Sequence, residues 1–528
     1  TTRTRIEGYD EDEGKQPPRR ITRLRSRLDN VGHVVDRPQH VYVVPADGSA
    51  PPRNLTPGPA QFAGPTWTPD SAALVVSGAT HDRWDLEPHV DLHRLDIADG
   101  TMTGLTRQTG AYTLPAISPD GSRIAFVGTD EPESSPRNLH VAVRAVDGED
   151  QVWVSAAIDR TFAPYPGAQP PHWLDEHDLL LVVEDRGNVH LYRASADGSV
   201  DPVPVWAGEG VVTGYHEAGS TIALTMTTAD RPAELYVLDG ERLRRLTHVT
   251  STFANTTGLR RPQQFVVASR DGSVELDAWL LTPPDVDPAR SYPLLLNIHG
   301  GPFTQYGNGF FDEVQMQAAA GYVVLWCNPR GSSGREEAFG RAIVGPSLGG
   351  SGWGGVDFDD VMGVLDHVLE AHPYVDADRL GILGGSYGGY LTSWAVGHTD
   401  RFAAAVSERA VNNVASLEWG SDAAGGFRRT LGASHLDDPD LYQRMSPIQY
   451  VRNIRTPLLI VHSDQDLRCP VEQADQLFVA LRLLERDVEL VRFPAESHEL
   501  SRSGSPVHRR QRAEIILEFF ARHLKPDS

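Results

Sequence analysis

The chain is short of cysteine, of positive charge and of long apolar stretches. Its 528 residues hold only two cysteines, Cys327 and Cys469, which excludes a disulfide framework. So few cysteines favour either a reducing compartment, such as the cytoplasm, or a protein that is indifferent to redox conditions. No Cys/His cluster has the spacing of a zinc site, so neither a metal nor another cofactor is expected. No apolar run reaches the roughly 18 residues that a membrane-spanning helix needs, so a membrane is not expected among the partners.

The charge balance is strongly acidic. Asp and Glu number 71 against 48 Lys and Arg, for a net charge of -23, which would repel a phosphate backbone and argues against nucleic acid as a partner. The plainest interpretation of this charge is that it keeps the protein in solution. A chain of this length is too long for a single ordinary core, so we expect at least two domains. The sequence does not specify the oligomeric state, and a homo-oligomer is one of the states it allows.

A turn signal repeats through the first half of the chain. Asp-Gly dipeptides favour tight turns because both residues tolerate positive φ, and here they recur every 42 to 52 residues between alternating apolar and polar stretches. That period, with about four short strands in each repeat, is typical of a β-propeller blade. The sequence therefore predicts an all-β propeller over residues 1–258, with about four clear blades. The dipeptides are Asp47-Gly48, Asp99-Gly100, Asp147-Gly148, Asp197-Gly198 and Asp239-Gly240.

Four blades are few for a closed ring. The first visible repeat begins partway through a blade, and the chain starts on Thr1 rather than on a methionine. We therefore expect the propeller to be N-terminally incomplete. The segment 10–37 is charged, contains proline and carries no repeat, so we expect it to be a blade connection or a loop.

From about residue 259 the pattern changes to apolar runs that alternate with helical stretches. A hairpin at 264–281 comes first, and six near-continuous apolar runs follow it, which indicates a mostly parallel eight-stranded sheet covered on both faces. Between and after the runs, residues 356–371, 471–485 and 506–524 show helical periodicity. The order, a hairpin and then alternating strands and helices, predicts an α/β-hydrolase domain over residues 259–528. The runs are Leu294–Ile298, Tyr322–Trp326, Leu380–Leu383, Ala403–Val406, Leu458–Val461 and Val488–Val491.

A candidate nucleophile lies in the turn Gly384-Gly-Ser-Tyr-Gly-Gly389. The turn follows directly on an apolar strand and precedes a helix, which is the context of a nucleophile elbow. Such a turn is strained so that the hydroxyl of Ser386 stands clear of the sheet, and glycines flank it because side chains there would collide with the adjoining strand and helix. The competing interpretation is a glycine-rich turn with an incidental serine.

A serine hydroxyl needs a base and an orienting carboxylate to act as a nucleophile, and in this fold they follow in the order Ser, acid, His. The last two strands run into loops that hold Asp466 and His498, which we predict to be the acid and the base. Asp464 competes as the acid. His508 competes as the base, although it lies in the terminal helical stretch. Two N–H groups must hold the oxyanion, and we predict those of Tyr387 and Gly301, the second from the loop His299-Gly-Gly-Pro302.

Four motifs in order carry a resemblance over nearly the whole chain. They are His299–Pro302, Asn328-Pro-Arg-Gly-Ser332, Gly384–Gly389 and His462-Ser-Asp-Gln-Asp466. With the propeller pattern before them, the chain resembles the prolyl oligopeptidase family, and within it the acylaminoacyl-peptidase branch with its bacterial aminopeptidase-like members. The resemblance implies a serine peptidase that cleaves short peptides, with the propeller screening out folded proteins. It also implies that Asp466 is the acid and that Arg468 binds a substrate carbonyl.

The end of the peptide that is recognised is less fully specified. His299 stands where prolyl oligopeptidase proper has a tyrosine, so strict proline or dipeptidyl specificity is not expected. An aminopeptidase would need a carboxylate for the free ammonium, for which Glu408 is the first candidate and Glu496 the second. An ion pair with an arginine is the alternative role of Glu408.

The apolar side of the substrate site is predicted from aromatic residues near the elbow. Phe303, Trp394 and Tyr390 could line a pocket for an apolar or acylated end, although aromatics near an elbow are more often core. The sequence thus predicts a serine exopeptidase acting at the N-terminal end of short peptides, of acylaminoacyl-peptidase or aminopeptidase type. The alternative is a carboxylesterase or amidase acting on small esters or amides with the same triad.

Overall fold

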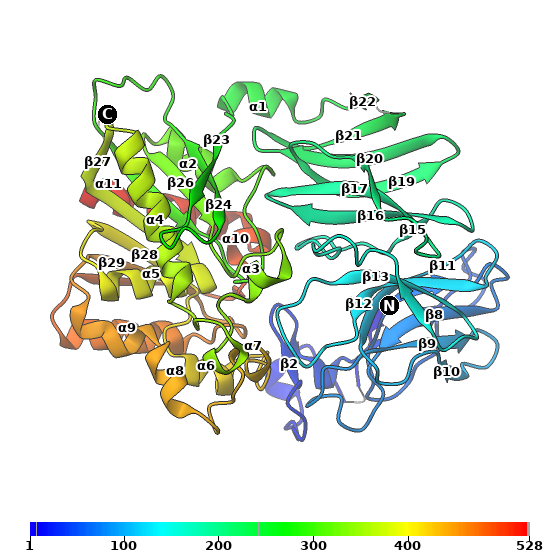
Figure 1. Cartoon of the computed structure of the whole chain (residues 1–528). Coiled ribbons are helices and arrows are strands. Elements are labelled where there is room, and N and C mark those ends of the chain that lie inside the picture. The colour runs from blue at the N-terminus through cyan, green and yellow to red at the C-terminus, as the bar shows by residue number, and fades with distance from the viewer. Residues whose placement is uncertain (7, 241, 525–528) are drawn as a thin grey trace.

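A computed structural model of the chain describes residues 1–6, 8–240 and 242–524. It has an all-β part on one side and an α/β part on the other (Figure 1). In the described residues no helix is both long and apolar enough to cross a membrane.

The all-β part contains four consecutive four-stranded units, as expected for propeller blades. Each unit is a meander of antiparallel strands, and the third and fourth touch through one parallel bridge between Val189 and Val211. The inner strands β8, β12 and β16 are buried almost throughout, because neighbouring units cover both of their faces. Burial alternates along β20 and β21 of the last unit, which matches the period-two pattern of a strand with one covered face. The first unit contains β7 (Phe62–Trp67), β8 (Ala73–Gly78), β9 (Asp91–Asp96) and β10 (Met102–Gly104), and the second contains β11 (Ala111–Ile117), β12 (Arg123–Thr129), β13 (His140–Ala145) and β14 (Gln151–Trp153). The third unit contains β15 (His172–Trp173), β16 (Asp178–Asp185), β17 (Asn188–Ser195) and β18 (Val203–Trp206). The fourth contains β19 (Val211–Ala218), β20 (Thr221–Thr228), β21 (Arg231–Asp239) and β22 (Arg242–Arg245).

Short strand pairs precede these blades. They are β1 (Thr2–Arg3) with β4 (Gln39–His40), β2 (Arg27–Leu28) with β3 (Gly32–His33), and β5 (Tyr42–Val43) with β6 (Arg53–Asn54). Between them, the segment 10–37 leaves the blades, and its part around β2 and β3 lies against the other half of the molecule (Figure 1). It is therefore more than the loop or blade connection that the sequence suggested.

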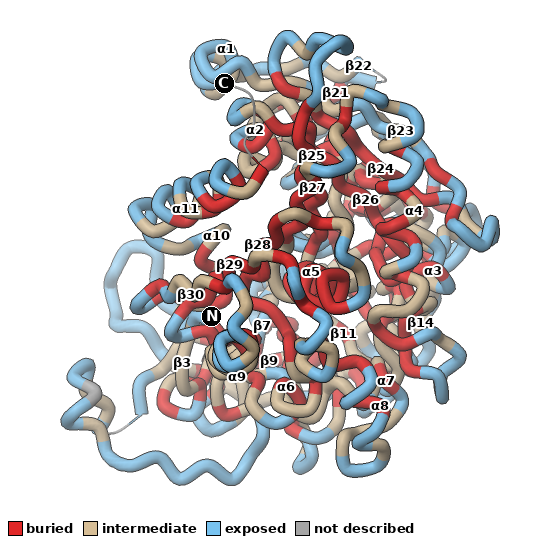
Figure 2. The backbone as a smooth tube through the Cα atoms, turned by 90° about the vertical axis from the view of Figure 1, so that its left-hand side faces the viewer, coloured by how far each residue is buried: buried red, intermediate tan, exposed pale blue. Residues whose placement is uncertain are grey.

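The α/β part is built on the predicted eight-stranded sheet. Its strand order is β23-β24-β26-β25-β27-β28-β29-β30, with the first two pairings antiparallel and the other five parallel. The inner strands are buried almost throughout, as Figure 2 shows, which explains their near-continuous apolar sequences. The strands are β23 (Gln263–Ala268), β24 (Glu275–Leu281), β25 (Tyr292–Ile298), β26 (Val323–Asn328), β27 (Val375–Gly385), β28 (Ala404–Glu408), β29 (Leu458–Ser463) and β30 (Val488–Phe493).

Helices cover both faces of this sheet. One face packs against α4 (Val356–Ala371), α5 (Tyr387–His398) and α9 (Glu472–Leu483), and the other packs against α2 (Asp312–Ala319) and α11 (Pro506–Leu524). The predicted helices at 356–371, 471–485 and 506–524 thus correspond to α4, α9 and α11 within two residues. The remaining helices are α1 (Ser251–Thr257), α3 (Glu337–Arg341), α6 (Val414–Gly420), α7 (Arg428–Leu431), α8 (Pro439–Arg444) and α10 (Leu500–Ser503).

The two parts are joined by buried polar contacts as well as by the chain. Arg186 at the β16–β17 turn pairs with Asp277 of β24 at 2.7 Å, and the hydroxyl of Ser333 donates to Glu184. The amide of Asn308 donates to the carbonyl of Gly187 at 2.8 Å. A domain division at residue 258 stays a prediction; it falls in the connection between α1 and β23.

Candidate active site

Ser386 occupies a sharp turn between β27 and α5. Its backbone has φ 62° and ψ -121°, in the left-handed half of the map that residues other than glycine rarely occupy. The Ser386 N–H donates to the carbonyl of Glu408 at 3.0 Å, which fixes the turn against the end of β28. The serine is half-buried, while the strand before it and the helix after it are buried in the core.

The glycines around Ser386 are required by contact. A Cβ on Gly388 would lie 2.1 Å from the carbonyl oxygen of Ile298, and one on Gly384 would lie 2.6 Å from the backbone of Gly388. Helix α5 therefore begins close to the neighbouring strand, as the sequence argument on sterics required. No rotamer change relieves these clashes, because the atoms that would be struck belong to backbone.

Asp466 and His498 form a buried pair at the ends of the next strands. The Nδ1 of His498 lies 2.7 Å from Oδ2 of Asp466, and the two residues are 4% and 3% exposed. The amide of Cys469 donates to Oδ1 of Asp466 at 2.8 Å, and His462 lies 3.4 Å from Oδ2. Burial raises the pKa of Asp466 to about 6 and lowers the pKa of His498 below its ordinary value. The lowered value leaves His498 a neutral imidazole at neutral pH.

The competing residues are engaged elsewhere. Asp464 is exposed and pairs with Arg492 at 2.7 Å. His508 pairs with Glu496 at 2.6 Å. Of the acids and histidines that the sequence left open, the structure therefore brings Asp466 and His498 together.

Ser386 and the pair of His498 and Asp466 lie on one edge of the sheet. β27, β28, β29 and β30 are adjacent and parallel, so their carboxyl ends meet. Burial raises the pKa of the Cys469 thiol, and a hydrogen bond with the Ser386 hydroxyl acts against that rise; Cys469 thus adjoins both Ser386 and Asp466. In the described chain no hydrogen bond joins Ser386 Oγ to His498, a contact that is often long until substrate binds.

The two predicted oxyanion donors belong to the start of α5 and to the loop after β25. Tyr387 is the first residue of α5, so its N–H has no intrahelical acceptor. The loop after β25 runs beside the elbow, because a Cβ on Gly300 would lie 3.4 Å from the Cβ of Ser386. Gly301 in that loop has φ 122°, a conformation open to glycine. His299 is buried and bonds to the hydroxyl of Ser332 at 2.9 Å, which ties this loop to the Asn328–Ser332 motif.

Glu408 does not have the free carboxylate that an ammonium site needs. It is 5% exposed, Arg512 donates to both of its carboxylate oxygens, and Arg409 lies at 3.2 Å. Burial alone would raise the pKa of Glu408, but the two guanidiniums hold it down at about 2. The structure therefore corrects the substrate-binding role predicted for Glu408. Glu496 is likewise occupied, by His508 and by the amide of Ser505 at 3.1 Å.

Of the predicted aromatics, one is half-buried and two lie in the core. Trp394 is 8% exposed and stacks on Tyr390 and on His398 within α5, with ring centroids 5.9 and 4.1 Å apart. The predicted pocket role of Trp394 and of Tyr390 is therefore wrong, since both rings pack the helix against the core. Phe303 is half-buried beside Gly340 of α3, in the loop that leads from Gly301.

Arg468 is the exposed cation of the site. Its Nε lies 2.6 Å from Oδ1 of Asp422, a carboxylate whose side chain is 1% exposed. Asp422 and Asp29 are residues of this site that the sequence did not reveal. No local pattern could have found them, because their partners lie between 46 and 469 residues away. In the described chain no group of three or more His, Cys, Asp or Glu side chains could hold a metal ion.

A serine elbow on a mixed eight-stranded sheet, with a His–Asp pair at the ends of the following strands, defines an α/β-hydrolase. Residues 308–527 match the prolyl oligopeptidase family. The chain therefore carries a domain of that family of serine peptidases.

Relatives and solved structures agree with this class. The chain is 38% identical over 360 residues to the uncharacterized peptidase YuxL of Bacillus subtilis, a match that covers 67% of this chain and 54% of that protein. It is 29% identical over 415 residues to dipeptidyl-peptidase 5 of Aspergillus oryzae, covering 76% and 54%. The chain thus spans about half the length of the curated relatives it matches. The solved acylaminoacyl peptidase of Pyrococcus horikoshii is 28% identical, with a TM-score of 0.84, and the match covers 100% of this chain and 80% of that one.

Proposed function

We propose that this chain is a serine exopeptidase that hydrolyses short peptides from their N-terminal end. Ser386 is the nucleophile, His498 the base and Asp466 the acid, while the N–H groups of Gly301 and Tyr387 hold the oxyanion. The observation that carries this proposal is the buried pair of His498 and Asp466, at 2.7 Å, on the same sheet edge as the strained turn of Ser386. A surface histidine would need no such carboxylate partner.

The proposed reaction is acyl transfer in two steps. His498 takes the proton of Ser386 as its oxygen attacks the scissile carbonyl, and then gives that proton to the leaving amine. Water repeats the sequence on the acyl-enzyme and releases the acid. Asp466 holds the imidazole with its Nε2 free toward the serine, and the two N–H groups stabilise the negative oxygen that forms at each step. Arg468 remains the proposed contact to a substrate carbonyl.

An acylated N-terminus fits this site better than a free one. The two candidate carboxylates for an ammonium already have partners in the protein, since Glu408 pairs with the guanidinium of Arg512 and Glu496 bonds to the imidazole of His508. A solved relative, 27% identical, is titled an acylaminoacyl peptidase in complex with Z-Gly-Gly-Phe-chloromethyl ketone, which supports the acylaminoacyl-peptidase type. The β-blades fit a screen against folded proteins. The two buried free cysteines fit a reducing compartment such as the cytoplasm.

One substrate panel tests the assignment. The same di- to tetrapeptides are offered with a free and with an acetylated N-terminus, and kcat/KM is compared for each pair. We expect the acetylated members to be cleaved with the higher kcat/KM, the acetyl-amino acid being released. Preference for the free amine would instead assign the aminopeptidase type and would require another carboxylate at the site.

A carboxylesterase or amidase is the second candidate. It would use the same triad, so the elbow does not separate the two. The panel therefore includes a p-nitrophenyl ester and a peptide amide with the same acyl group. Hydrolysis of the ester with no cleavage of any peptide amide would favour the esterase.

A further inference from the structure

A hairpin of the N-terminal segment lies on the two loops that carry the acid and the base. β2 and β3 form this hairpin, and in Figure 1 it is the dark blue segment beside α6 and α7. Arg27 of the hairpin donates to the carbonyl of Gly420 in α6. The contact therefore joins residues almost 400 positions apart in the sequence.

At the tip of this hairpin the carboxylate of Asp29 is buried against backbone. Asp29 is 9% exposed. The amide of Leu467, the residue after Asp466, donates to Oδ1 of Asp29 at 2.9 Å. The amide of His498 donates to the same carboxylate at 3.3 Å to Oδ1 and 3.2 Å to Oδ2. One side chain thus satisfies one N–H from each of the two catalytic loops.

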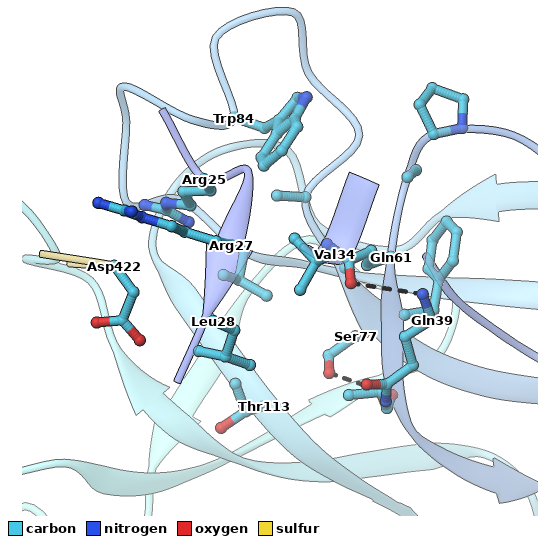
Figure 3. A pocket seen from close by; sticks show the side chains of 17 residues that line it. Arg25, Arg27, Leu28, Val34, Gln39, Gln61, Ser77, Trp84, Thr113 and Asp422 are labelled. Atoms are coloured by element: carbon cyan, nitrogen blue, oxygen red, sulfur yellow. Dashed lines mark hydrogen bonds between the residues drawn. The ribbon is translucent and has the colours of Figure 1, made fainter. Parts of the chain in front are cut away.

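The hairpin also reaches the exposed cation of the site. The amide of Asp29 donates to Oδ2 of Asp422 at 2.8 Å, and the other oxygen of Asp422 accepts from Arg468 at 2.6 Å. Asp422 in turn borders a cavity of about 350 Å³ between the hairpin and the first blade. Figure 3 shows Asp422 at one side of this cavity, near Arg25 and Arg27.

The acid and the base need such a tie because they stand on separate loops. Asp466 follows β29 and His498 follows β30, and loops are the more mobile parts of a fold. A bond of 2.7 Å between their side chains requires both backbones to be fixed, and a displacement of about 1 Å can lower a rate roughly 100-fold. A carboxylate that accepts from both backbones sets their separation directly.

We propose that Asp29 is a positioning residue, which holds the loops of Asp466 and His498 together from the N-terminal segment. This inference rests on the proposed function, because the residues it positions are the proposed acid and base. It adds a requirement that the C-terminal half alone would not meet: the catalytic pair is completed by a side chain from the other end of the chain.

The charge of Asp29 gives the proposal a second readout. Asp29 faces His498 and Asp466, and Asp422 and Arg468 lie beside it. The other charged or titratable groups that interact electrostatically with the pair of His498 and Asp466 are Arg409, Arg502, His462 and Glu408. Among these groups the negative charge of Asp29 raises the pKa of His498. Removing that charge should therefore lower the pKa of the base and move the acid limb of kcat/KM to lower pH.

The test uses the full chain with Asp29→Asn and Asp29→Ala, and Asp36→Asn as the matched control. Asp36 is a buried aspartate of the same segment, 7% exposed, whose partner is Arg19. The readouts are kcat and KM on a chromogenic acetyl-peptide anilide, the pH profile, and the rate at which a fluorophosphonate labels Ser386. The last readout needs no peptide substrate. Thermal unfolding confirms that each variant is folded, and Asp29→Asn, which keeps the shape of the side chain, serves where the alanine variant does not fold.

We expect Asp29→Ala to lower kcat and the labelling rate about 10- to 100-fold with little change in KM. Asp29→Asn should lower both less and should shift the acid limb to lower pH, while Asp36→Asn behaves as wild type. A folded Asp29→Asn with wild-type kcat, or with an unshifted acid limb, overturns the inference. Ser386→Ala distinguishes a failure of the proposed function from a failure of the role of Asp29. If Ser386→Ala stays active, the proposed function itself is wrong. If Ser386→Ala is inactive and the Asp29 variants have wild-type activity, only the role of Asp29 is wrong.

Discussion

The two halves of the molecule contribute to the site in different ways. In the α/β half each proposed catalytic group follows a strand of one sheet, so parallel pairing alone brings Ser386, Asp466 and His498 to one edge. In the β half the strands repeat without a catalytic motif, and the contribution is made by single side chains that cross the boundary. Asp29 and Glu184 are two of these. Regular secondary structure thus brings the proposed catalytic residues together, and isolated long-range contacts tie the two halves to each other.

The largest expected effect is on the chemistry of the α/β half. Ser386→Ala should lower kcat/KM about 10⁴- to 10⁶-fold, because attack on the carbonyl has no other nucleophile. Alanine tolerates the φ of 62° as well as serine does, so the melting temperature should not change. Ser393→Ala is the control. Ser393 is a buried serine of α5, the helix that follows Ser386, and it bonds to Ser407 at 2.8 Å. Its replacement should leave kcat/KM near the wild-type value. A Ser386→Ala protein with wild-type turnover would remove the nucleophile assignment.

Next in size is the loss of a buried ion pair behind the elbow. Arg512→Met leaves the carboxylate of Glu408 without its two donated bonds, which should lower the free energy of unfolding by about 3–5 kcal/mol. Arg522→Met on the same helix breaks a pair with Glu489 at 2.7 Å that is 48% exposed on the arginine side, and should cost less than about 1 kcal/mol. Urea unfolding measures both variants. Equal losses would show that Glu408 does not depend on Arg512.

The smallest effect is expected at the boundary between the halves. Glu184 is 1% exposed, is joined to no cation in the described chain, and accepts from Ser333 and from the amide of Tyr165. Burial raises its pKa to about 7. Because the folded state then binds the proton more tightly than the unfolded state, the contribution of Glu184 to the free energy of unfolding is fully present below about pH 4.5 and is lost as the pH rises through about 7.

Glu184→Gln should remove this dependence. The amide stays neutral at every pH, so the variant should gain stability over wild type on the order of 3 kcal/mol at pH 8 and little at pH 4.5. Glu176→Gln, an exposed glutamate before the same strand, is the control and should keep the wild-type slope. Unfolding free energies at several pH values between 4.5 and 8 give both slopes; parallel slopes for Glu184→Gln and wild type would contradict the prediction.

Much of the fold was predictable because its signals are local. Near-continuous apolar strands and helical periodicity gave the eight-stranded sheet, and α4, α9 and α11 fall within two residues of their predicted ranges. Repeated Asp-Gly turns indicated four blades, which the structure contains. Packing could not be predicted in the same way. A tryptophan such as Trp394 looks the same in the sequence whether it lines a pocket or fills a core. Its location in the core is evident only from its stacking on Tyr390 and His398.

The sequence by itself determined the elbow of Ser386, the order of its partners and the sheet that brings them together. These depend on backbone geometry, which a short run of glycines and apolar residues specifies. Only the tertiary structure decided which partners each carboxylate has. Asp466 pairs with His498, Glu408 pairs with Arg512, and Asp29 accepts from the amides of Leu467 and His498. The physical reason is that the role of a carboxylate depends on the cations and N–H groups within about 3 Å of its oxygens, and those partners can lie anywhere in the chain.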